Sequence, residues 1–153
     1  MTVTAPAISP VPIRRPRTWR SVLVLGGWTV LAAAPFEVGL LVPYYGNALH
    51  EVPVAELTSG AYDPKDLPWP TGFLGGLVHA AAGLALAFTP LALIGMAAIS
   101  GTAAVQEWVT FPVEHRARRT VAAGLVAVTV LGLGLLALLA TPTASALVTW
   151  RLD

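Results

Sequence analysis

The chain has no cysteine among its 153 residues, which excludes disulfides, thiolate metal sites, cysteine nucleophiles and dithiol redox chemistry. Charged residues are also scarce. They make up 11% of the chain, whereas a soluble domain usually carries about a quarter. So few charges could not cover the water-facing surface of a chain that is 56% hydrophobic. The composition therefore predicts a protein of the lipid bilayer.

A strong net charge is missing as well, since the formal value is +1. No basic stripe alternates with aromatic residues, so we expect no nucleic-acid partner. The chain also lacks a phosphate-binding P-loop, a G-x-S-x-G nucleophile motif and an H-E-x-x-H zinc motif. The polar side chains between the first two hydrophobic blocks meet no metal-ligand spacing: His50, Glu51, Glu56, Asp63 and Asp66. With its histidines also poorly spaced for haem, the sequence predicts no metal site and no cofactor.

The hydrophobic residues fall into three long blocks, at about 21–42, 71–100 and 120–141. Each can cross the roughly 30 Å hydrocarbon layer, which takes about 20 helical residues. The second block is longer than that, so it must tilt or bend, and Pro90 provides a cause for a kink. We therefore expect an all-α integral membrane protein with a three-span helical bundle.

The polar segments complete this organisation. Residues 1–18 are rich in proline and alanine, and we expect a disordered tail before a membrane domain at 19–153. The stretch 101–119 carries Gln106 and Glu107 beside apolar residues and then reaches a proline. It predicts a short cytoplasmic interfacial segment rather than a further span. Aromatic residues near the span ends are expected to anchor at the membrane interface: Tyr44, Tyr45, Trp69, Trp108 and Trp150.

The arginine distribution predicts the orientation. Four arginines precede the first block and three precede the third, whereas the loop 43–70 has one lysine and the C-terminal tail one arginine. The positive-inside rule then places the N-terminus in the cytoplasm and the C-terminus outside. The richness in Arg, Ala, Val, Leu and Gly indicates a GC-rich bacterial genome, hence a bacterial inner (plasma) membrane. A cleaved signal peptide ending at Ala34 is the alternative, but Pro35 follows at once and the apolar run continues.

One acid lies clearly inside a predicted span. Glu37 lies about six residues from the outer end of the first block, and His79 lies about eight residues into the second from the same side. At 1.5 Å per residue they reach similar depths, about 9 and 12 Å. Because an unpaired ionisable group in hydrocarbon costs about 2.5–3.5 kcal/mol, the sequence predicts a Glu37–His79 contact. A purely structural contact and a Glu37 that extends to the outer surface are the alternatives.

Small residues share a helical face with each member of this pair. Gly72, Gly76 and Gly83 flank His79, and Ala33 and Gly26 lie on the Glu37 face. Since small residues allow close helix approach in lipid, these faces are expected to pack inward and to support oligomerisation.

Two functions from different classes follow. The first is a non-catalytic subunit or homo-oligomeric accessory protein of a membrane complex, whose partners are the lipid bilayer and other membrane subunits or copies of itself. The alternative is a small membrane-embedded enzyme or proton-linked transport component. In that alternative Glu37 is the catalytic acid or base and His79 is its partner.

Overall fold

The computed structural model describes residues 17–64, 66–110 and 116–152, and these form helices without any strand. Three helical segments are long and apolar enough to cross a membrane: Trp19–Gly46, Gly72–Val109 and Arg118–Leu139. The prediction of an all-helical chain with three such segments is confirmed. The predicted tail at 1–18 lies almost wholly outside the described residues.

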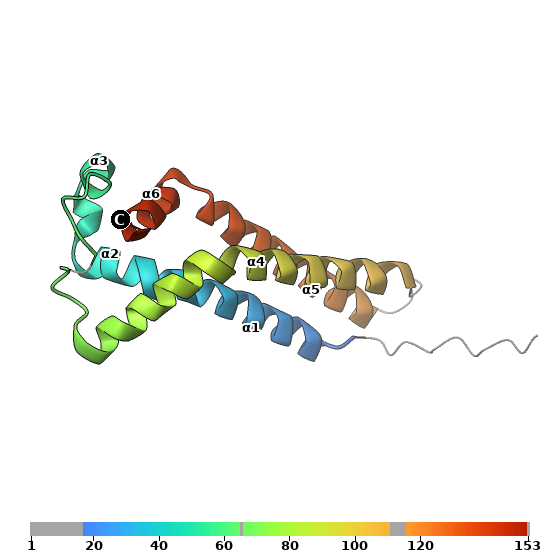
Figure 1. Cartoon of the computed structure of the whole chain (residues 1–153). Helices are drawn as coiled ribbons and strands as arrows, with labels where there is room; N and C mark the ends of the chain where they lie inside the picture. The colour runs from blue at the N-terminus through green and yellow to red at the C-terminus, as the bar shows by residue number, and fades with distance from the viewer. Residues whose placement is uncertain (1–16, 65, 111–115, 153) are drawn as a thin grey trace, which may run out of the picture.

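The first segment is continuous but not uniform (Figure 1). It consists of α1 (Trp19–Phe36), a π-helical turn η1 (Glu37–Leu41) and α2 (Val42–Gly46). The π turn lies between Pro35 and Pro43, which both lack the N–H that an α-helical ladder needs. The segment therefore runs four residues beyond its predicted end at Val42. The outer connection that follows contains η2 (Leu49–Glu51) and α3 (Val54–Leu57).

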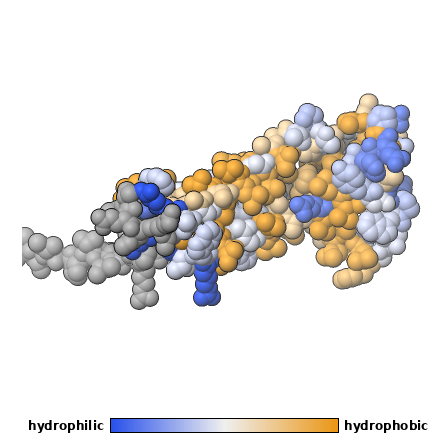
Figure 2. Space-filling model, turned by 180° about the vertical axis from the view of Figure 1, so that it is seen from behind, coloured by the Kyte–Doolittle hydropathy of each residue, from blue (hydrophilic) through white to orange (hydrophobic). Residues whose placement is uncertain are grey.

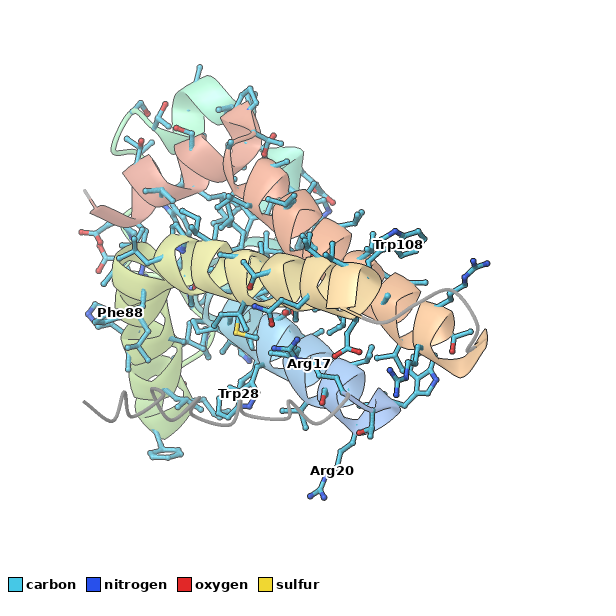
Figure 3. All side chains as sticks on the ribbon, turned by 90° about the vertical axis from the view of Figure 1, so that its right-hand side faces the viewer. Arg17, Arg20, Trp28, Phe88 and Trp108 are labelled. Carbon is cyan, nitrogen blue, oxygen red and sulfur yellow. The ribbon has the colours of Figure 1, made fainter. Side chains whose placement is uncertain are left out.

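The second segment is one helix of 39 residues, α4 (Gly72–Thr110), with Pro90 inside it. Figures 1 and 3 show α4 changing direction in its middle, which agrees with the predicted kink at Pro90. Its outer half, Gly72–Thr89, runs away from the third segment, α5 (Arg116–Leu139), whereas its inner half lies along α5.

The expected interfacial segment at 101–119 is wrong for its first ten residues, because α4 continues through Thr110. The reason is packing. Ala103 and Ala104 of α4 are buried against Val22 of α1 and against residues of α5 in the inner core, which consists of Val22, Ala103, Ala104, Val121, Leu125 and Val128. Burial of this apolar face stabilises the helix through Thr110. Residues 111–115 of the expected segment lie outside the described part of the chain.

The three spans meet halfway along the bundle at Gly132 of α5. A Cβ there would lie 3.5 Å from the Cβ of Ala97 and 3.7 Å from a methyl group of Thr29. Nearby, the hydroxyls of Ser100 and Thr129 lie 2.9 Å apart and join α4 to α5. Figure 2 shows hydrophobic surface over the middle of one face and most hydrophilic residues toward its two ends, as expected for a membrane helix bundle.

The outer end carries a second core that the sequence did not indicate. The C-terminal residues form a helix, α6 (Pro142–Leu152), which packs on the connection between the first two spans. This outer core consists of Tyr44, Leu49, Leu57, Leu147 and Trp150. Trp150 is only 1% exposed, and its indole N–H donates to the carbonyl of Tyr62 at 2.7 Å. The predictions that Trp150 and Tyr44 anchor at a membrane interface are therefore wrong, since both side chains are buried in protein.

Candidate functional sites

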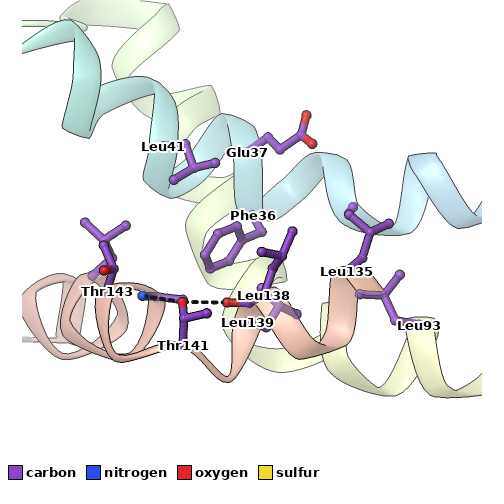
Figure 4. A pocket seen from close by; sticks show the side chains of 12 residues that line it. Phe36, Glu37, Leu41, Leu93, Leu135, Leu138, Leu139, Thr141 and Thr143 are labelled. Carbon is purple, nitrogen blue, oxygen red and sulfur yellow. Dashed lines mark hydrogen bonds between the residues drawn. The ribbon is translucent and has the colours of Figure 1, made fainter. Parts of the chain in front are cut away.

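Glu37 begins the π turn, where the N–H of Val42 bonds to its carbonyl. Its side chain is exposed and forms no hydrogen bond or ion pair with any residue of the described chain. In Figure 4 the carboxylate is directed away from Phe36 and Leu139. π turns occur often at functional positions, so this local geometry supports further attention to Glu37.

A cavity of about 220 Å³ lies beside Glu37, between the first span, α4, α5 and the start of α6. Its wall is almost wholly apolar, and the residues around it are Ala33, Phe36, Glu37, Leu41, Leu93, Leu135, Leu138, Leu139, Thr141, Thr143, Ala144 and Leu147. The Thr141 hydroxyl is already engaged, because it donates to the carbonyl of Leu138 at 2.7 Å (Figure 4). The cavity is therefore apolar, with Glu37 at its edge and the carboxylate directed away from Phe36 and Leu139.

His79 has a different partner from the one expected. Its Nδ1 lies 2.8 Å from Nη2 of Arg151, which reaches it from α6. The predicted Glu37–His79 hydrogen bond does not form within the described chain. Matched depth did not determine helix rotation. The first span meets α4 where Gly39 lies against the backbone of Ala82, and the two side chains then line separate pockets.

The expected inward packing of the small-residue faces is also wrong in part. A Cβ added at Gly72, Gly76 or Gly83 would meet no atom within 4 Å. Gly26, on the first span, packs against Val128 of α5 rather than against α4. The close approach between the first two spans is made by Gly39, a residue that no sequence pattern singled out.

The outer pocket around His79 has a volume of about 310 Å³. It is bounded by the first turns of α4, the outer connection and the end of α6, through Pro43, Pro64, Leu67, Trp69, Pro70, Gly75, Gly76, Val78, His79 and Arg151. Burial lowers the pKa of Arg151 from its ordinary value, and the negative charge of Asp63 acts in the opposite direction. A half-buried guanidinium beside an imidazole makes this the most polar of the pockets described here.

The inner end of the bundle holds an acid that the sequence analysis assigned to an interfacial surface. Glu107 of α4 is only 5% exposed. Its Oε1 accepts the backbone N–H of Arg17 at 3.1 Å, and the guanidinium Nη1 of Arg17 lies 3.9 Å away. That Nη1 also donates to the carbonyl of Ala103 and to Oε1 of Gln106. The small residues three and four positions before Glu107 were the available signal, because they let α1 approach.

Within the described residues no group of three His, Asp or Glu side chains is placed to hold a metal ion. Comparison of the chain with protein-family models, with curated proteins and with solved structures finds no match in any of the three.

Proposed function

We propose that this chain is a small multi-pass membrane protein that works as a non-catalytic subunit and assembles with further copies of itself. The observation that carries the proposal is an exposed stripe of small residues on the outer half of α4: Gly72, Gly76, Ala80, Gly83 and Ala87. Their spacing of three or four residues puts them on one helical face.

The geometry around the stripe supports assembly. No atom of the chain lies within 4 Å of a Cβ added at Gly76 or Gly83, so this face is open. The bend at Pro90 directs it away from α5 (Figure 1). In lipid the hydrophobic effect does not drive helix association, because lipid tails are as apolar as the side chains. Helices associate instead by close backbone packing at small residues. A second α4 is the simplest partner for such a face.

Cysteine crosslinking tests the assembly, because the chain has no native cysteine. Gly83→Cys should form disulfide-linked dimers in oxidised membranes. Val126→Cys, on an exposed face of α5, is the matched control and should remain monomeric. Equal crosslinking at the two positions, or none at Gly83→Cys, would contradict assembly through α4. Gly83→Ile should reduce dimer formation measured through a second cysteine at Ala87, since a branched side chain prevents close approach.

The arginine bias supports a bacterial plasma-membrane location with a cytoplasmic N-terminus. With three spans, the C-terminus and the 43–70 connection lie on the same side, and α6 does pack on that connection. Both then belong outside the cell.

A proton-linked or catalytic role for Glu37 is the second candidate, and its position in the π turn, without a hydrogen-bond or ion-pair partner among the described residues, favours this role. His79 does not serve as the partner in this version, because it bonds Arg151. Proteoliposomes with an internal pH dye provide the test. Wild-type protein should dissipate an imposed pH gradient faster than Glu37→Gln, and equal rates would reject the proton-linked role.

A further inference from the structure

We propose that the outer pocket binds the phosphate of a phospholipid headgroup through Arg151 and His79. The hydrogen bond between these two residues fixes the chemistry of the pocket. Arginine has donors only, so Nδ1 of His79 must be the acceptor at 2.8 Å. The imidazole is therefore the neutral tautomer with its proton on Nε2. The remaining polar atoms of the pair are all N–H donors.

Among the described residues, the other side chains around the pocket add no acceptor. They are aliphatic residues, prolines and glycines, together with Trp69, whose indole N–H is also a donor. A pocket whose side-chain polar atoms all donate is complementary to a group that only accepts, as a phosphate diester does. The pocket also lies at the N-terminal end of α4, where the helix dipole is positive.

The negative charge of Asp63 also acts on Arg151 and raises its pKa, against the effect of burial. Asp63 does not itself line the pocket, although Pro64 does. It therefore offsets part of the guanidinium charge without occupying the space beside it. Burial has a larger effect on the pKa of Arg151 than Asp63 does. An anion in the pocket would therefore replace part of the hydration that the guanidinium has lost.

The position of the pocket favours a lipid over a free anion. It lies against the first two turns of the second candidate span, and the ends of membrane-spanning helices face the headgroup region. On the same turns of α4, Phe73 is 86% exposed, Leu74 56% and Leu77 52%, so these side chains can contact acyl chains. Its volume of about 310 Å³ is at the small end of the usual range for ligand pockets, roughly 300–1,000 Å³, which suits a headgroup.

Native mass spectrometry of the full-length protein in zwitterionic detergent tests this assignment. Dioleoyl phosphatidylglycerol is titrated in, with dioleoylglycerol, which has the same chains and no phosphate, as the comparison lipid. Wild-type protein should bind the phospholipid and not the diacylglycerol. Arg151→Gln should weaken phospholipid binding roughly tenfold, the effect of losing one charge-assisted hydrogen bond. Arg20→Gln, at the opposite end of the bundle, is the matched control and should leave it unchanged.

Gly76→Leu provides a variant that keeps the Arg151–His79 pair. A Cβ added at Gly76 would meet no atom within 4 Å, so the leucine side chain should fill the pocket without disturbing the fold. It should reduce phospholipid binding as Arg151→Gln does, whereas Gly83→Leu, two turns deeper in α4, should not. The proposal would be overturned if neither Arg151→Gln nor Gly76→Leu reduced phospholipid binding. Displacement of the phospholipid by millimolar inorganic phosphate would overturn the lipid assignment, because free phosphate would then be the occupant. Gly76 also belongs to the assembly stripe, so Gly83→Leu, which changes the stripe without touching the pocket, separates loss of the pocket from loss of assembly.

Discussion

Gly39→Ala is the sharpest test of how the first two spans are joined. An added Cβ would lie 2.7 Å from the carbonyl carbon of Ala81 and still closer to the backbone N and Cα of Ala82. Ordinary van der Waals contact begins at 3.4 Å, so the closest of these atoms requires the two helices to separate by about 1 Å. The neighbours are backbone atoms of a helix and cannot rotate away.

The expected cost follows from this separation. Inserting a methyl group into a packed site typically costs about 1–3 kcal/mol, and a backbone obstacle places Gly39→Ala at the upper end of that range. In an unobstructed helix the same replacement would stabilise by about 0.5–1 kcal/mol, because alanine restricts the unfolded chain more than glycine. We therefore expect the effect of glycine-to-alanine replacement on the free energy of unfolding to differ by about 3 kcal/mol between an obstructed and an open position.

Gly27→Ala and Gly134→Ala are the matched controls, since a Cβ at either position meets no atom within 4 Å. The free energy of unfolding can be measured by titrating sodium dodecyl sulfate into detergent micelles and following tryptophan fluorescence. Gly39→Ala should lower it by about 2–3 kcal/mol, whereas both controls should leave it unchanged or raise it slightly. Equal stability of Gly39→Ala and Gly27→Ala would refute the close contact between η1 and α4.

Three further predictions concern the two ends of the bundle. Glu107→Ala should lower the free energy of unfolding by about 1–3 kcal/mol in the same titration, because the backbone N–H of Arg17 loses its acceptor; a stability equal to wild type would reject that role. Trp150→Phe should cost about 1 kcal/mol, since it removes the donor to the carbonyl of Tyr62 while retaining most of the ring; Trp108→Phe, at a 68% exposed position, is its control and should be neutral. For the orientation, Ser59→Cys should react with an impermeant maleimide in whole cells and Ala117→Cys should not, and the reverse labelling would show that the N-terminus lies outside.

The sequence predicted the three spans well because each depends on a long local run of apolar residues. The bend in α4 was predictable for the same reason, since Pro90 removes a ladder hydrogen bond whatever surrounds it. α6 was missed because its folding depends on distant partners. Trp150 and Leu147 are buried only where the outer connection covers them, and no local pattern indicates that contact.

The prediction that Glu37 pairs with His79 failed for a different reason. Helix rise gives the depth of a residue from its place in the sequence, but the direction of its side chain depends on helix rotation. The π turn at Glu37–Leu41 changes the rotation of everything that follows it, and Gly39 then fixes which face meets α4. Helix rise therefore predicted similar depths for Glu37 and His79, but helix rotation directs the two side chains to different faces.

The polar contacts of the bundle are arranged as the dielectric profile of a membrane would favour. Charged side chains make their contacts at the two ends, Arg17 with Glu107 at one and Arg151 with the imidazole of His79 at the other. Halfway along the described bundle the contact between spans is the one between the hydroxyls of Ser100 and Thr129. Charge costs most at the membrane centre, so this arrangement needs no function to explain it. Glu37 does not fit it. Among the acids in the described spans, it is the one without a partner, and it lies beside a cavity. Since neither burial nor pairing stabilises this carboxyl group in the bundle, a Glu37 that faces hydrocarbon would need a proton or a contact from outside the chain, such as a second subunit or a ligand.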